Sequence, residues 1–409
     1  MRDTGRRRRA RLAICVCYGL TGVVAAIWGA SLPALDARLD LGTTAIGALL
    51  MVVAAAALVA MPAAGVLLDR VAGSLVLRLA LPASAVALLG PALTESVPVL
   101  FVFAAVFGAL LGILNVSLTV AVAAVERATG PLMSTAHGVW TLGAVLGGST
   151  VSALLFAGLD VPIVMSVPAV AVAALVLAAA PGVGRSLSLP TTAPELSSEG
   201  RDRPRLTPHE LGVLGLIGAA AFVSEGAATD WAGVHATRVL GANAAQGSLV
   251  FTGFFAAMTV VRFAGDPLRG RFGPRRTIGV SGAIAALGYV VVLLSAVTPP
   301  SLSVAMAMTG WILAGAGMAV VWPIVASSVG AAAGSPRQLS LVAAISFGGG
   351  LVGPGVIGLV AGTAGLSAAL LIPAALATIV ALAAPAAVGA LTSRTTPRER
   401  DRHDTLIQN

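Results

Sequence analysis

Residues 41–68 read LGTTAIGALLMVVAAAALVAMPAAGVLL, a run in which no side chain carries a charge. A membrane-spanning helix needs about 20 mostly apolar residues to cross roughly 30 Å of hydrocarbon. The run is longer than that, and it therefore predicts a transmembrane helix.

Runs of this kind follow one another along the whole chain. The last two are each long enough for two helices, which we expect to separate near Thr298-Pro299-Pro300 and Gly362-Thr363-Ala364-Gly365. The sequence therefore predicts an all-α integral membrane protein with twelve transmembrane helices. The uncharged runs occupy 12–35, 41–68, 79–94, 96–125, 128–159, 161–184, 211–224, 239–261, 277–336 and 338–393.

Composition excludes several other classes of protein. Of the 409 residues, 57% are hydrophobic and 10% are charged, whereas a soluble protein of this length needs a charged surface. All 25 basic residues are arginine. Without lysine, no Walker A side chain can reach nucleotide phosphates and no Schiff base with retinal or pyridoxal phosphate can form. We therefore expect no role for ATP and no cofactor, and the scattered histidines and two neighbouring cysteines predict no metal site.

The arginines gather on one side of the predicted membrane. With the N-terminus in the cytoplasm, every arginine except Arg38 and Arg238 falls in a cytoplasmic segment. This is the positive-inside rule, and it predicts that both termini are cytoplasmic. It also explains the net charge of +8 without a nucleic-acid partner. The arginine-only, alanine-rich composition suggests a GC-rich bacterial genome, so we expect a multi-pass protein of the bacterial inner membrane.

The chain repeats itself weakly with a period near 200 residues. The stretch AGVLLDRVAG at 64–73 aligns with AGDPLRGRFG at 264–273, and Leu41-Gly42 aligns with Leu240-Gly241. Two halves of six helices would then share one topology. The predicted parts are a basic cytoplasmic tail (1–11), an N-terminal six-helix half (12–181), a polar cytoplasmic linker (182–209), a C-terminal six-helix half (210–391) and a cytoplasmic tail (392–409).

The loop after the second span has the spacing Gly65-x-x-x-Asp69-Arg70. Together with the six-plus-six spans and the long central loop, this spacing resembles the major facilitator superfamily, over essentially the whole chain. Shorter stretches are similar to poorly characterised bacterial members grouped with fucose-permease-like transporters. These stretches are Glu225-Gly226-Ala227-Ala228-Thr229-Asp230-Trp231, Arg262-Phe263-Ala264-Gly265-Asp266 and His137-Gly138-Val139-Trp140.

The resemblance implies a secondary active transporter, not an enzyme, that moves a small organic solute by alternating access with proton coupling. Its expected partners are the solute, protons and the lipid bilayer, and we expect a monomer. Because polar residues are sparse in the spans, efflux of a drug or metabolite is our leading interpretation. The alternatives are proton-coupled uptake of a sugar-like nutrient, a membrane-embedded enzyme and a non-transporting sensor.

Some family features are missing, and they weaken the case for export. Asp69-Arg70 is followed by Val71-Ala72-Gly73-Ser74 instead of the usual continuation, and residues 96–125 contain no arginine. The antiporter motif in span 5 is reduced to Gly143, Gly147 and Gly148.

The resemblance also implies that the two repeated loops gate the cytoplasmic side. A carboxylate at Asp69 would be stabilised by a helix N-terminus and by a guanidinium, for which Arg127 is the expected partner. Glycine at position 65 would allow a tight turn and close backbone approach. A solvated loop charge is the alternative. The implied gating residues are Gly65, Asp69, Arg70, Arg127, Gly265, Asp266, Arg271 and Gly273.

Glu225 is the first candidate for proton coupling. If span 7 begins at Leu211, Glu225 lies about 21 Å into the hydrocarbon. An ionised carboxylate there costs about 2.5–3.5 kcal/mol, so it should face the protein interior or a wet cavity and be protonated over part of the cycle. A structural hydrogen bond is the alternative. Asp230 is the second candidate, nearer the outer surface and on a different helix face.

Three residues are candidates for lining a substrate cavity. Asn115 shares one stripe of span 4 with Gly108, Gly112 and Thr119, where close helix packing is the competing explanation. Trp28 and Trp322 lie in spans 1 and 10, which line the cavity in this superfamily, but tryptophans also anchor helices at the membrane surface. We expect His137 to cap or pack a helix, and Arg262 to reach the membrane surface or pair with Asp266.

The arginine distribution predicts a testable topology. We expect Asn409 and Glu199 to be cytoplasmic, and Asp36 and Glu95 to lie outside. Single cysteines at these positions, in a variant lacking Cys15 and Cys17, would be labelled in intact cells with a membrane-impermeant reagent. Labelling is expected at positions 36 and 95 alone, and labelling at 199 would overturn the topology.

Overall fold

The computed structural model describes residues 2–129, 132–187, 206–332 and 336–407, and every regular element within them is a helix. Among these residues, twelve helical segments are long and apolar enough to cross a membrane. A helix satisfies its own backbone hydrogen bonds, which is what a segment surrounded by hydrocarbon requires. The predicted fold class is therefore confirmed.

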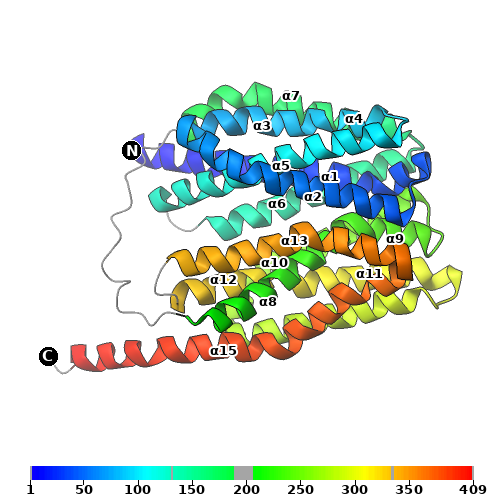
Figure 1. The fold of residues 1–409 in the computed structure, drawn as a ribbon. Coiled ribbons are helices and arrows are strands. Elements are labelled where there is room, and N and C mark those ends of the chain that lie inside the picture. Colours follow the sequence, from blue (N-terminus) through cyan, green and yellow to red (C-terminus); the bar gives the residue numbers. More distant parts are fainter. Residues whose placement is uncertain (1, 130–131, 188–205, 333–335, 408–409) are drawn as a thin grey trace.

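The first six spans form one layer of the molecule, drawn at the top of Figure 1. They are α1 (Arg2–Leu39), α2 (Gly42–Arg70), α3 (Gly73–Ala87) with the short α4 (Leu89–Leu93), α5 (Val97–Thr129), α6 (Met133–Phe156) and α7 (Val161–Leu187).

The second six spans form the lower layer in Figure 1. The long α10 contains two spans, because Gly273 adopts φ 76° and ψ 157° and turns the chain between them. The elements are α8 (Pro208–Ala227), η2 (Ala228–Ala232) and α9 (Gly233–Arg238), which form one span, then α10 (Ala244–Ser295), α11 (Pro300–Met318) with α12 (Val321–Ala332), α13 (Pro336–Ala364), and α14 (Leu366–Ala369) with α15 (Leu371–Ile407).

Glycines in left-handed conformations mark equivalent turns in the two layers. Gly42, after span 1, and Gly241, after span 7, both have φ of 72°. Gly158 and Gly365, which precede the last span of each layer, have φ of 75° and 85°. Glycine adopts such angles without the steric cost of a Cβ. The turns therefore repeat with the period that the sequence shows.

The expected helix breaks fall where the sequence placed them, but the predicted tails are helical. Helix α10 ends at Ser295 and α11 begins at Pro300. By contrast, α1 begins at Arg2 and α15 continues to Ile407; arginine, which is frequent in both tails, is a good helix former. Most of the predicted linker, residues 188–205, lies outside the described residues.

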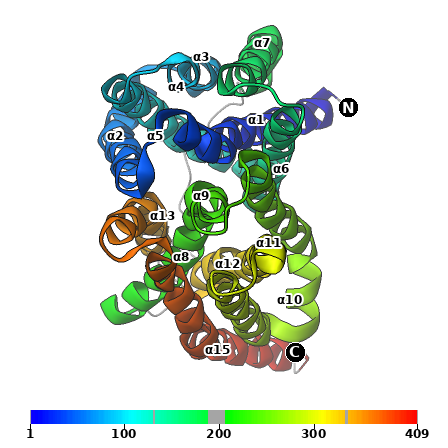
Figure 2. The same cartoon turned by 90° about the vertical axis from the view of Figure 1, so that its right-hand side faces the viewer.

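The two layers meet along two pairs of neighbouring helices. Helix α2 packs against α13, and α6 packs against α10, while α1 also contacts α9, η2 and α10. Figure 2 shows these pairs at the two edges of the molecule, with α1, α8 and α9 between them. Both termini lie at one end of the bundle (Figure 1), and the opposite end is called the outer end below.

Small residues close the contact between the layers toward the outer end. A Cβ placed on Gly358 of α13 would lie 2.2 Å from the Cα of Gly47 of α2, so the two backbones touch. A Cβ on Gly29 of α1 would lie 2.6 Å from the carbonyl oxygen of Thr229. No larger side chain fits at these positions unless the layers separate.

Replacing Gly358 with alanine is expected to open the outer end. Overpacking a close contact costs about 1–3 kcal/mol, which corresponds to a shift of about 5- to 150-fold between closed and open forms. The readout is the labelling rate, in intact cells, of a single cysteine at Leu50, just inside the contact. The control is Gly348→Ala in the same helix, where a Cβ would meet nothing within 4 Å. An unchanged rate in Gly358→Ala would contradict the account.

Candidate functional site

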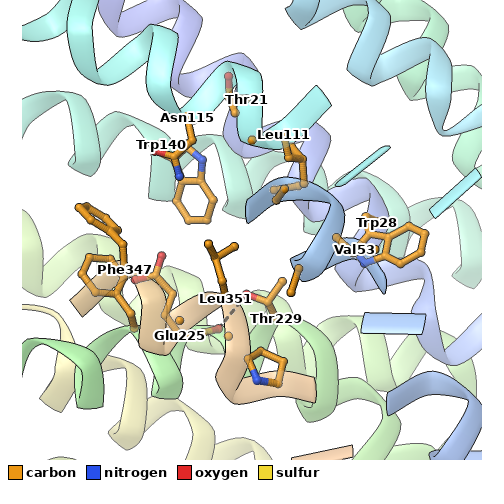
Figure 3. A pocket seen from close by; sticks show the side chains of 18 of the residues that line it. Thr21, Trp28, Val53, Leu111, Asn115, Trp140, Glu225, Thr229, Phe347 and Leu351 are labelled. Atoms are coloured by element: carbon orange, nitrogen blue, oxygen red, sulfur yellow. Dashed lines mark hydrogen bonds between the residues drawn. The ribbon is translucent and has the colours of Figure 1, made fainter. Parts of the chain in front are cut away.

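A cavity of about 290 Å³ lies between the two layers, at the middle of the bundle. Its wall combines α1, α2, α5 and α6 from the first layer with α8, η2 and α13 from the second. Figure 3 shows side chains from both layers pointing into the same space, with Asn115 and Trp140 facing Glu225 and Leu351. Ligand pockets in proteins are typically concave, mostly apolar and provided with a few polar groups, and this cavity fits that description.

Aromatic rings form much of the wall. Trp28 lies against Phe107, with ring centroids 5.3 Å apart, and Phe222 lies against Phe347 at 4.5 Å. Trp28 and Asn115 line the cavity, as the sequence suggested. Trp322 is not among the described lining residues, because it lies behind Phe222 and Phe347, 5.5 Å and 5.6 Å from their centroids.

His137 occupies a more central position than its place near a helix end suggested. Its ring packs between Tyr18, at 5.6 Å, and Phe347 of the other layer, at 6.5 Å. It also lines the cavity. A packing role was expected, but contact with both layers was not, because span 5 was not placed against span 11 from the sequence.

Glu225 of α8 lines the cavity and is held by an arginine from α10. Nη2 of Arg262 donates to Oε2 of Glu225 at 2.9 Å, and only 10% and 14% of the two side chains are exposed. The sequence placed Arg262 at the membrane surface or beside Asp266, and that placement was wrong. The arginine turns inward because the largely buried carboxylate of Glu225 offers a partner where hydrocarbon offers none.

Asp230 also lines the cavity, which corrects the expectation that it faces away from Glu225. Residues five apart in an α-helix lie about 140° from each other around the axis. Here Ala228–Ala232 form the π-helical turn η2, whose i→i+5 hydrogen bonds bring residues five apart closer to one face. The turn thereby directs both carboxylates into the cavity. Such turns are frequent at functional sites, but nothing in the local sequence announces this one.

The gating loops are only partly described. The side chains of Asp69, Arg127 and Asp266 lie outside those that the structure describes, so the expected latch stays a prediction. Arg70 and Arg271 are exposed. Gly265 and Gly273 both lie where a side chain would not fit or would be strained. A Cβ on Gly265 would lie 2.8 Å from Cγ1 of Val320, and Gly273 makes the turn with a positive φ. Gly65 differs from the expectation, because it lies inside α2 with nothing within 4 Å of its Cβ position.

Among the described residues, no group of three or more His, Cys, Asp or Glu side chains is placed to hold a metal ion.

Comparisons with known proteins agree with this architecture. Residues 214–407 match the family model described as Major Facilitator Superfamily. The uncharacterized transporter y4wD of Sinorhizobium fredii (strain NBRC 101917 / NGR234) is 29% identical over 372 residues, which cover 90% of this chain and 95% of that protein. An uncharacterized MFS-type transporter of Yersinia pestis is 29% identical over 366 residues, covering 87% of this chain and 89% of that protein.

Over residues 214–407 the chain matches the Major Facilitator Superfamily, and over most of its length it is similar to proteins described as transporters, one of them as MFS-type. It is therefore a secondary transporter and a multi-pass membrane protein, and the superfamily is one of transporters rather than enzymes. A crystal structure of the E. coli fucose:proton symporter, FucP, has the same fold, with a TM-score of 0.57. That comparison covers 93% of this chain and 98% of FucP at 16% identity, so the likeness concerns the fold alone.

An ion pair joins the two layers of this transporter above the cavity, at the outer end. Arg238 of α9 donates through Nε to Oδ2 of Asp36 at 2.5 Å and through Nη2 to Oδ1 at 2.7 Å. The same Oδ1 accepts the backbone N–H of Gly42 at 3.0 Å. The Asp36 side chain is only 3% exposed. A bidentate guanidinium–carboxylate pair is among the stronger charge-assisted contacts, so this pair stabilises the closed outer end.

Arg38 and Arg238, the exceptions to the arginine distribution, thus both have specific contacts. Arg238 bridges the layers, whereas Arg38 donates to the carbonyl oxygens of Ala92 and Leu93 within the first layer. In the sequence, these two arginines stand out because they fall outside the predicted cytoplasmic segments. That position was the one indication that they make a specific contact at the outer end. It could not say that the partner of Arg238 would be Asp36, 202 residues away.

Arg238→Gln is expected to destabilise the transporter by roughly 2 kcal/mol, because it leaves the buried Asp36 charge unpaired. The double variant Asp36→Asn/Arg238→Gln should lose less than the sum of the two single losses. Thermal unfolding of the purified protein measures all three, with Arg38→Gln as the matched control. Strictly additive losses would show that the pair has no energetic coupling.

Proposed function

We propose that this transporter couples proton movement to the transport of a small amphipathic organic solute, with Glu225 as the coupling residue. The proposal rests on one observation: a carboxylate in the middle of the apolar span Pro208–Arg238 lines the cavity between the layers and is ion-paired with Arg262 at 2.9 Å. Ionisable residues at this depth are expensive and usually functional. The shared fold with a fucose:proton symporter is consistent with proton coupling.

The ion pair supplies a physical route to coupling. While Glu225 is ionised, Arg262 compensates its charge. When a proton reaches the carboxylate from the cavity, the charge attraction to Arg262 is lost and the contact between α8 and α10 weakens. Solute binding to the same wall can then bias the same two conformations, which is what coupling between two ligands requires.

In the proposed cycle, two six-helix halves, residues 12–181 and 210–391, rock about the cavity. The halves close alternately at the outer end, through the Asp36–Arg238 pair, and at the cytoplasmic end, through the Asp69 loop. Both termini are cytoplasmic in this proposal, and the membrane is the bacterial inner membrane. Efflux of a drug or metabolite is the preferred direction, because the wall is largely apolar and aromatic and offers a richly hydroxylated sugar few partners.

Glu225→Gln is expected to bind solute but to lose proton-driven accumulation, because glutamine keeps the size and cannot exchange a proton. Solutes that raise the melting temperature of the purified protein would be tested first. Proteoliposomes with an imposed pH gradient then measure accumulation, and solute exchange without a gradient measures the remaining transport.

The matched control is Glu95→Gln, an exposed outer carboxyl outside the cavity. It should accumulate solute like the wild type. If Glu225→Gln vesicles also concentrate solute to the wild-type level, Glu225 is structural and the proposal is wrong.

A further inference from the structure

The charges around the cavity do not balance. Among the described lining residues there are two carboxylates, Glu225 and Asp230, and no arginine. Arg262 compensates Glu225 from behind the wall, through the 2.9 Å ion pair. One negative charge, that of ionised Asp230, is left facing the cavity.

Asp230 has no described partner of its own. Among the described residues, none donates a hydrogen bond to its carboxylate or forms an ion pair with it, and the residue is half-buried where it lines the cavity. An unpaired carboxylate is costly in a low-dielectric site. Either a proton or a cation from the cavity must therefore neutralise it.

Other titratable groups face Asp230 or lie on the elements packed against it, and none supplies that cation in this conformation. Arg262 is engaged by Glu225, and Arg238, toward the outer end, is engaged by Asp36 and Asp40. Tyr18 of α1 and His137 of α6 line the cavity, whereas His235 of α9 and Tyr289 of α10, which hydrogen-bonds Ser224, are fully buried outside it.

Aromatic side chains form a large part of the surroundings that a cation would meet. Trp28, Trp140, Phe107, Phe222 and Phe347 all line the same cavity as Asp230. Aromatic faces attract organic cations, most strongly when water is excluded, and they also accommodate an apolar body. The volume of about 290 Å³ lies near the lower limit for ligand pockets, so it suits a small solute.

We propose that the cavity binds a small amphipathic organic cation, an amine or quaternary ammonium, whose positive head pairs with Asp230 and whose apolar part packs against the aromatic wall. This deepens the proposed function by assigning its substrate class, and it rests on the same cavity. The proton and the cation compete for one carboxylate. Binding of the cation to the protonated form releases one proton from Asp230, so the net charge of the site does not change.

Competition of this kind fixes the pH dependence of binding. While the free site is protonated, each unit rise in pH should tighten cation binding by about tenfold, and the affinity should level off once Asp230 is ionised. Asp230→Asn removes the competition and should make the affinity independent of pH.

The test uses two probes that share a benzyl group and a tetrahedral head but differ in charge, benzyltrimethylammonium and phenylmethanesulfonate. Calorimetric titration of the purified full-length protein gives each Kd over a range of pH. Wild type should bind the ammonium and not the sulfonate, and Asp230→Asn should bind the ammonium about tenfold or more weakly at high pH. Asp160→Asn, which changes an exposed loop carboxyl, is the control and should match the wild type.

The inference is overturned if the sulfonate binds as tightly as the ammonium, or if Asp230→Asn keeps the wild-type affinity and pH slope. The titration needs no gradient and no working transport cycle. A negative titration would therefore reject the substrate class alone. Retained accumulation in Glu225→Gln vesicles would instead reject the coupling role of Glu225.

Discussion

The cost of placing a charge in hydrocarbon constrains this molecule more than any other interaction. Nearly all arginines avoid it by lying at the end of the bundle that the sequence assigns to the cytoplasm. The charged groups described deeper in the spans are placed specifically. Asp36 meets Arg238 across the layers, Glu225 meets Arg262 within one layer, and Asp230 faces the cavity. The cavity is thus where an unpaired charge can be kept, and this is why we propose it as the site of function.

The same constraint connects charge with conformation. Two layers that rock against each other must not leave a buried carboxylate unpaired, so the Asp36–Arg238 pair, which joins them, favours one arrangement. The Asp36–Arg238 pair and the contact of Gly47 with Gly358 both hold the outer end closed. Glycine contacts of this kind are either formed or broken, since two backbones in direct contact cannot move closer and lose the contact when they move apart. That property gives two discrete packings, which alternating access requires.

Hydrophobic runs and helix breakers were enough to predict the twelve spans and the breaks before Pro300 and at Gly365, because hydrocarbon selects for these patterns of residues. Glu225 was found from its depth alone. Sequence could not place Asp230 in the cavity, since a helical wheel assumes α-geometry and η2 is a π-turn. Nor could it pair Arg262 with Glu225, 37 residues earlier, because the partner depends on where the folded chain places α8 relative to α10.

The central claim is that the two layers open alternately at the two ends of the bundle, about this cavity. Distances measured at both ends test it most directly. Spin labels at Glu95 and Val297 report the outer end, and labels at Ala72 and Arg276 report the end that carries the termini, in a variant lacking Cys15 and Cys17. Pulsed electron paramagnetic resonance in lipid should give a second population in which the outer distance lengthens while the other shortens, with proportions that change with pH. A single unchanged distance at each end, at every pH, would contradict the account.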